Sequence, residues 1–244
     1  KDVAARMPFR PNPEGKAPDP GGLLADWLAY AALGSTLRAA NTIPFDRPAC
    51  PSYYCLWGSQ TPELSAYEQR FVKGVAGQKK ALLEVLAGDA DPRRRAAAAY
   101  LLAYVPEGKS VADLMLKTLG DPAPGVRAAA LQVLSDITVY HKDVFIDLNK
   151  LIPALDFPTV SDRSKALTVF VGLADRPDYR HALTSRAAPR ILELLKQQQS
   201  SIHDLAYTVL GMLAKESFGR RDYKAWKDWL ASQSGAAATA PVRP

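Results

Sequence analysis

The sequence predicts an all-α fold in which antiparallel helix pairs stack on one another as an α-solenoid. One pattern of small and apolar residues at helical spacing occurs four times along the chain. A second amphipathic segment precedes each copy, and in the first two pairs Gly and Pro mark the junction. No segment alternates polar and apolar residues with period two for the length of a strand. The 244 residues are 48% hydrophobic, which is enough for a sizeable core.

The first 22 residues are expected to form an extended, proline-rich arm. The stretch MPFRPNPEGKAPDPGG, from Met7 to Gly22, holds five prolines and few residues to bury. Such a segment is either poorly ordered or laid over the folded body of the protein.

Residues 23–76 are expected to form an N-terminal helical segment that includes a loop with Cys50 and Cys55. The most apolar stretch of this segment is Leu23–Ala40, which carries Asp26 and Arg38. A membrane-spanning helix needs about 20 predominantly apolar residues, so this stretch is too short and too polar to be one. We therefore expect no membrane span.

Four repeats are expected within residues 77–232, each aligned on an anchor residue near the start of its second helix. The anchors are 32, 36 and 40 residues apart, which is the period of helix-pair repeats. Positions three, six and seven after the anchor share one helical face, and the alanine at position three lets a neighbouring helix approach closely. The anchors are Arg95, Arg127, Arg163 and His203, and the alanines are Ala98, Ala130, Ala166 and Ala206.

The first helix of each pair is predicted from an amphipathic segment that precedes the anchor. In the first two pairs the turns GDADP and GDPAP follow this segment, with Gly at the end of one helix and Pro near the start of the next. The last predicted helix, Asp222–Ser232, contains Trp226 and Trp229 and is expected to cap the stack. Residues 233–244 are expected to be a disordered tail. The four first-helix segments are QKKALLEVLAG, SVADLMLKTLG, DVFIDLNKLIPALD and APRILELLKQ.

The repeats resemble those of the HEAT family of α-solenoids. In that family the second helix is commonly introduced by an Asp, with Val-Arg five and six positions later, and Asp121, Val126 and Arg127 have this spacing. The third and fourth repeats depart from the pattern, with Phe157 and Gln197 in the Asp position. The resemblance implies a structural ladder of charged residues along the stack. Its members here would be Asp89, Arg95, Asp121, Arg127 and Arg163.

The two cysteines lie in the stretch ACPSYYCLWG. No second Cys or His pair accompanies them, so a metal site is not indicated. A disulfide between Cys50 and Cys55 is favoured over two free thiols, and a redox-active pair is the third alternative. A disulfide and a first residue other than Met favour an exported, periplasmic or secreted protein, with a cytoplasmic location as the alternative.

The same loop carries Tyr53, Tyr54 and Trp57, which are candidates for contact with a partner because aromatic side chains often anchor interfaces. The alternative is that these rings pack the N-terminal segment onto the first repeat.

Three basic residues, Arg93, Arg94 and Lys165, are further candidates for partner binding. They lie near the starts of second helices, outside the apolar pattern, where they can reach solvent. The alternative for the two arginines is a solvated first turn with no ligand. The formal net charge of +6 suits an acidic partner but lacks the clustering typical of nucleic-acid binding.

No catalytic, cofactor or metal site is indicated. There is no Gly-rich phosphate loop, nucleophile elbow or HExxH motif, and the three histidines are not spaced as metal ligands. We therefore expect a non-enzymatic scaffold or assembly subunit that binds another protein. The alternatives are a HEAT-like enzyme, of the DNA glycosylase or bilin lyase type, and a nucleic-acid-binding module. The partner's identity and the oligomeric state do not follow from the sequence.

Overall fold

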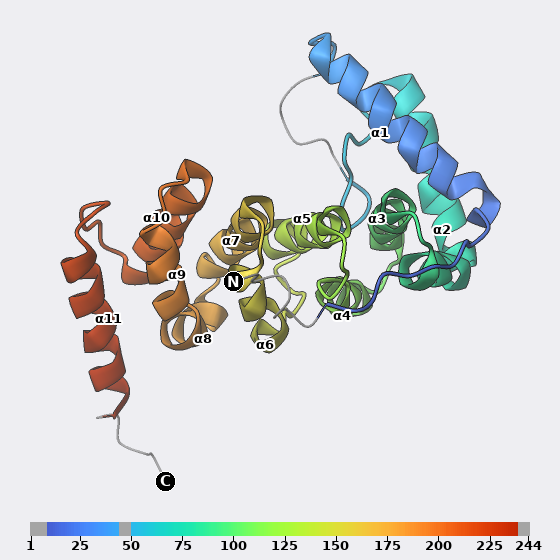
Figure 1. Ribbon diagram of the computed structural model, residues 1–244. Helices are drawn as coiled ribbons and strands as arrows, with labels where there is room; N and C mark the ends of the chain where they lie inside the picture. The colour runs from blue at the N-terminus through green and yellow to red at the C-terminus, as the bar shows by residue number, and fades with distance from the viewer. Residues whose placement is uncertain (1–8, 44–49, 239–244) are drawn as a thin grey trace. The chain divides into compact units, whose positions relative to one another are not determined.

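The computed structural model describes residues 9–43 and 50–238, without the side chains of 234–238, and this part of the chain is all-α (Figure 1). It contains helices and no named strand; the only β-type pairing is an isolated bridge between Gly15 and Asp89. The predicted fold class is confirmed. The chain divides into an N-terminal unit, Pro8–Asp147, and a C-terminal unit, which contains Leu148–Pro244.

The described residues of the N-terminal unit form five α-helices, and the sequence signals for the starts of these helices are local. Thr61 accepts a hydrogen bond from the backbone of Leu64, and Asp91 accepts one from the backbone of Arg93, as expected of N-cap residues. Three of these helices have Pro in their first turn. The helices are α1 (Leu23–Ala39), α2 (Pro62–Gly88), α3 (Pro92–Leu101), α4 (Gly108–Thr118) and α5 (Pro124–Tyr140), with short 3-10 turns at Pro20–Gly22 and Leu102–Tyr104.

The helix α2 is longer than the sequence analysis expected. We placed a boundary after residue 76, but α2 continues through it from Pro62 to Gly88. Glycine weakens a helix without breaking it. The two glycines near the expected boundary, Gly74 and Gly77, therefore stay helical, and at Gly74 the absent side chain leaves room for Leu23.

The alanine pattern marks helix contacts as predicted. Ala98 and Ala130 have no exposed surface, and they lie on α3 and α5, which pack against each other. The helices α2 and α4 pack against α3 and α5 respectively, so the unit contains two stacked helix pairs with α1 against the first.

The C-terminal unit continues the helix pairs in a less regular form. The expected first helix of the third pair is reduced to α6 and a 3-10 helix, Ile152–Asp156. Helix α7 packs against α10, and α9 also packs against α10. Ala166 and Ala206 are again fully buried. The helices are α6 (Leu148–Leu151), α7 (Val160–Ala174), α8 (Arg180–Arg186), α9 (Ala188–Leu195), α10 (Ser200–Ala214) and α11 (Tyr223–Ala238), with a 3-10 turn at Pro177–Tyr179 before α8.

Helix α11 covers the end of this unit. Trp226 is fully buried and meets Tyr207 and Phe218 edge-on. The helix runs to Ala238, so the start of the expected disordered tail at residue 233 is wrong by several residues. The rest of that tail, 239–244, lies outside the described residues.

Residues 9–19 contain no helix and pass over the turns of the repeats, as the dark blue segment of Figure 1 shows. The backbone of Arg10 donates a hydrogen bond to the Gly120 carbonyl at 2.8 Å, and Ala90 donates one to the Gly15 carbonyl at 2.6 Å. A Cβ atom at Gly15 would lie only 2.6 Å from the Gly88 carbonyl oxygen. This contact with the turn therefore requires glycine.

Candidate protein-binding surface

The loop that carries Tyr53, Tyr54 and Trp57 is cross-linked at one end by a disulfide between Cys50 and Cys55. Tyr54 lies between them in sequence and is only 6% exposed, with its ring stacked on Tyr100 at a centroid distance of 5.0 Å. The structure therefore corrects our assignment of Tyr54 to a partner-binding surface, because this side chain belongs to the core.

Trp57 attaches the other end of the loop to α1. Its backbone N–H donates to the Tyr30 hydroxyl at 2.7 Å, and its indole N–H donates to the Ala31 carbonyl at 3.3 Å. A Cβ atom at Gly34 would meet the indole ring at 2.1 Å, so the ring lies directly against the helix backbone. These contacts favour the packing alternative for Trp57.

Tyr53 is half-buried, and its hydroxyl lies at the surface. Its backbone N–H donates to the Ala103 carbonyl at 3.2 Å, and its hydroxyl donates to the Pro106 carbonyl at 2.9 Å. The ring centroid lies 4.7 Å from that of His141, just after the end of α5. Of the three predicted aromatic residues, Tyr53 remains the one available to a partner.

Two exposed apolar side chains adjoin in sequence His141 and Val144, which lie near Tyr53, in a region with no predicted binding role. Tyr140 is 55% exposed and Phe145 is 61% exposed. Gly108 connects this region to Tyr53, because a Cβ atom there would lie 2.7 Å from both the Tyr53 hydroxyl and a methyl group of Val144. We call Tyr53, Tyr140 and Phe145 the aromatic patch.

The sequence contains a weak signal for this patch. Tyr140 ends the helix beyond the repeating apolar positions, and Phe145 falls in a segment that we assigned to the first helix of the third pair. The structure forms a loop there, since α6 begins only at Leu148. The sequence does not indicate that this helix is shortened, so the exposure of Phe145 could not be predicted from it.

The predicted basic residues have different environments. Arg93 is 82% exposed at its side chain and pairs with Asp91 at 3.0 Å. Arg94 instead donates to the Asp89 carboxylate at 2.9 Å and to the Ala17 carbonyl at 2.7 Å. Our assignment of Arg94 to partner binding is therefore corrected: its guanidinium holds residues 9–19 against the first turn.

Arg93 and Tyr53 do not lie side by side. Arg93 lies in the first turn of α3, whereas the backbone of Tyr53 is bonded beyond the end of that helix, and a ten-residue helix is about 15 Å long. Lys165 lies in the other unit, where it is half-buried, and burial lowers the pKa of its ammonium.

Within the described residues, the charged ladder is seen between Arg95 and Asp121. Arg95 donates two hydrogen bonds to the Asp121 carboxylate, at 2.9 and 2.8 Å, and both side chains are almost fully buried. Arg10 adds a third charged hydrogen bond to Asp121 at 2.5 Å. Asp89 pairs with Arg94 of its own repeat instead of an arginine from a preceding one.

The ladder arginines share a second role. Each donates from Nη1 to the two carbonyls five and six residues before it, in the turn that precedes its helix. The pairs are Arg95 with Asp89 and Ala90, Arg127 with Asp121 and Pro122, and Arg163 with Phe157 and Pro158. The repeated arginine therefore fixes the turn even where the aspartate is replaced by Phe157.

A carboxylate and several aromatic rings meet inside the N-terminal unit, which is the combination that the glycosylase alternative requires. The Glu68 carboxylate accepts hydrogen bonds from the hydroxyls of Tyr30 at 2.5 Å and Tyr104 at 2.6 Å. Burial raises the pKa of Glu68, although the bonds from Tyr104, Tyr30 and the Gly58 backbone act to lower it. Glu68 is only 1% exposed, so these groups face the core and no groove.

Among the described residues, no group of three or more His, Cys, Asp or Glu side chains is arranged to hold a metal ion. In the same part of the chain, no helix combines the length and the hydropathy that a membrane crossing requires.

The repeats are identified by comparison with protein families. Residues 80–167 match the family described as HEAT repeats. Comparison with curated proteins and with solved structures gave no match. The matched range begins within α2 and includes the ladder rung, the helices from α3 to α5 and the start of the third pair. Over residues 80–167, the chain therefore matches the HEAT-repeat family.

Proposed function

We propose that the protein is a non-enzymatic scaffold that binds another protein through the aromatic patch of its N-terminal unit. HEAT repeats generally suggest a protein-interaction role, and each repeat packs on its neighbours while leaving long surfaces in solvent. The observation that carries the proposal is the exposure of Tyr140 and Phe145, at 55% and 61%. Large exposed aromatic side chains are typical anchors of interfaces.

The expected partner is an acidic protein. The chain carries a formal net charge of +6, which raises the rate of association with an acidic partner more than the final affinity. Arg93 is exposed enough to contribute to this attraction. The disulfide between Cys50 and Cys55 is compatible with export, so we expect the partner to be an exported protein as well.

Affinity capture with three versions of the protein tests the proposal. The first is the unchanged chain, and the second carries Tyr140→Ser with Phe145→Ser. The third is a matched control with Leu28→Ser and Val72→Ser, which are 44% and 49% exposed on α1 and α2. Circular dichroism verifies that all three are folded.

The proposal expects the unchanged chain and the control to capture the same protein, and the patch variant to lose it. Faster dissociation should account for most of the loss. Equal capture by all three versions would exclude the patch as the binding surface. Failure of the unchanged chain to capture any protein would oppose the scaffold itself, and assays for enzymatic activity would then take precedence.

A further inference from the structure

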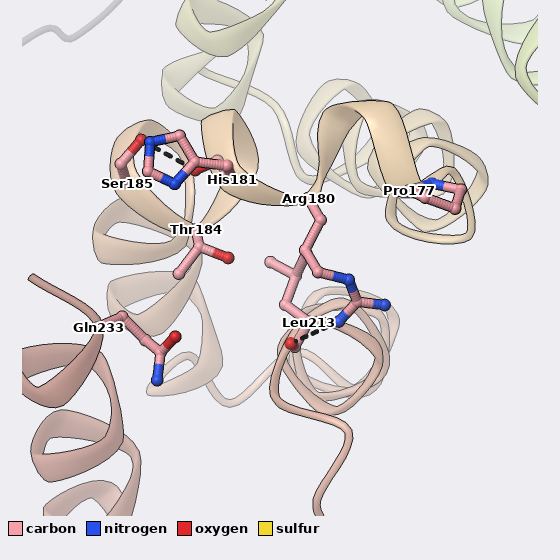
Figure 2. Close-up of a pocket in the computed structure, with 7 residues that line it drawn as sticks. All are labelled: Pro177, Arg180, His181, Thr184, Ser185, Leu213 and Gln233. Carbon is pink, nitrogen blue, oxygen red and sulfur yellow. Dashed lines mark hydrogen bonds between the residues drawn. The ribbon is translucent and has the colours of Figure 1, made fainter. Parts of the chain in front are cut away.

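A pocket of about 330 Å³ lies in the C-terminal unit, between α8, the end of α10 and α11 (Figure 2). This volume is at the lower end of the range of small-ligand sites. None of its seven lining residues carries a negative charge and Arg180 is cationic, so the lining has a positive group without a carboxylate. The lining residues are Pro177, Arg180, His181, Thr184, Ser185, Leu213 and Gln233.

Arg180 is the cationic group and is held in a fixed position. Its Nη1 donates to the carbonyls of Met212 and Leu213, at 3.2 and 2.8 Å, near the C-terminal end of α10. The side chain is half-buried, and no carboxylate of the described residues forms an ion pair with it. A guanidinium has five N–H donors, and the edge formed by Nε and Nη2 is not used by these two carbonyls.

Thr184 provides a second unused polar group. The residue is 9% exposed, and its hydroxyl makes no hydrogen bond within the described chain. Figure 2 shows this hydroxyl on the side of α8 that faces Arg180, with the Gln233 carboxamide across the pocket on α11.

We propose that this pocket binds an oxyanion, the carboxylate or phosphate group of a small ligand. Arg180 supplies the positive charge, which suits either group. The Thr184 hydroxyl and the Gln233 carboxamide supply neutral hydrogen bonds. The site belongs to the C-terminal unit and does not depend on the aromatic patch.

An NMR titration of the full chain with sodium phosphate and, separately, with sodium succinate tests the proposal. Sodium chloride at equal ionic strength is the reference. The expected result is a saturable shift of the Thr184 and Gln233 signals with at least one of the two anions. The anion that produces the shift identifies the chemical group that the pocket accepts.

Three variants distinguish binding from a general effect of salt. Arg180→Gln should weaken the response roughly 10- to 100-fold, since charged hydrogen bonds are lost. Thr184→Val leaves the bonds from Arg180 to α10 in place and should weaken the response about 2- to 10-fold. Arg186→Gln is the matched control, because Arg186 is exposed on the same helix and bonds to Asn149 outside the pocket.

The absence of a saturable shift with both anions would overturn the proposal. An undiminished response in both Arg180→Gln and Thr184→Val would also overturn it. If Arg180→Gln loosens the end of α10, Thr184→Val still provides the decisive measurement.

Discussion

Replacement of Asp121 by Asn is expected to destabilise the N-terminal unit strongly, because it removes the only negative charge at the buried ladder rung. The carboxylate accepts hydrogen bonds from Arg95, Arg10 and the backbone of Ala123. Asn has nearly the same shape, so the substitution tests charge and hydrogen bonding with little change in packing.

The magnitude follows from burial. The side chain of Asp121 has no exposed surface and that of Arg95 has 1%. Removal of one member of a buried ion pair leaves the other charge uncompensated, which costs about 3–5 kcal/mol. Part of the guanidinium remains satisfied, since Arg95 also donates to the carbonyls of Asp89 and Ala90. We therefore expect the lower part of this range, about 3 kcal/mol.

Urea unfolding followed by circular dichroism measures this change in the free energy of unfolding. Asp91→Asn is the matched control one repeat earlier. Asp91 pairs with the exposed Arg93, and Asn caps a helix as well as Asp does. The control should cost less than about 1 kcal/mol. If Asp121→Asn costs no more than the control, the buried rung does not stabilise the repeats and our reasoning is wrong.

The same variant should change the acid sensitivity of the protein. Burial tends to raise the pKa of Asp121, but hydrogen bonds from Arg95, Arg10 and Ala123 outweigh it and hold the pKa below its usual value. The stabilisation is therefore complete above the unfolded pKa of about 3.9 and is lost as the pH falls through the lower folded pKa. The difference in stability between the two proteins should shrink over that interval.

Three further predictions concern the disulfide, the helix contacts and the buried carboxylate. Thiol titration of the denatured, unreduced protein should find no free thiol at Cys50 or Cys55, and reduction should cost on the order of 2 kcal/mol because the loop is short. Ala130→Leu should overpack the contact between α3 and α5 and lower the free energy of unfolding by about 1–3 kcal/mol; unchanged thermal stability would show that this face is not packed. Because burial raises the folded pKa of Glu68, the unchanged protein should lose stability relative to Glu68→Gln as the pH rises from the ordinary glutamate pKa through the raised value. A difference that stays constant over this pH range would contradict the assignment.

The parts of the fold that were predicted correctly depend on local signals. Proline in the first turn determines where α3 and α5 begin, and the alanines at Ala98 and Ala130 mark the face where these helices meet. Both signals act within a few residues along the chain. The disulfide was favoured for a similar reason, because the two cysteines are five positions apart and can close a short loop.

Two residues were wrongly assigned to partner binding because the contacts that hold them are made with residues distant in sequence. Arg94 has the composition of a solvated helix start, but its partner Ala17 lies 77 positions away. Tyr54 belongs to an aromatic-rich loop, but Tyr100 of α3 draws it into the core. Arg180 had no distinguishing pattern, since its pocket requires α8, α10 and α11 together.

The first repeat shows why residues 9–19 belong structurally to the ladder. In an array, each carboxylate of the ladder needs an arginine, and the first one has no regular repeat before it. Asp89 meets this need with Arg94 and with backbone donors from Ala17 and Asp91. Arg10, from the same segment, binds Asp121 one repeat later. The proline-rich segment thus supplies at two successive turns the polar contacts that a preceding repeat would otherwise provide.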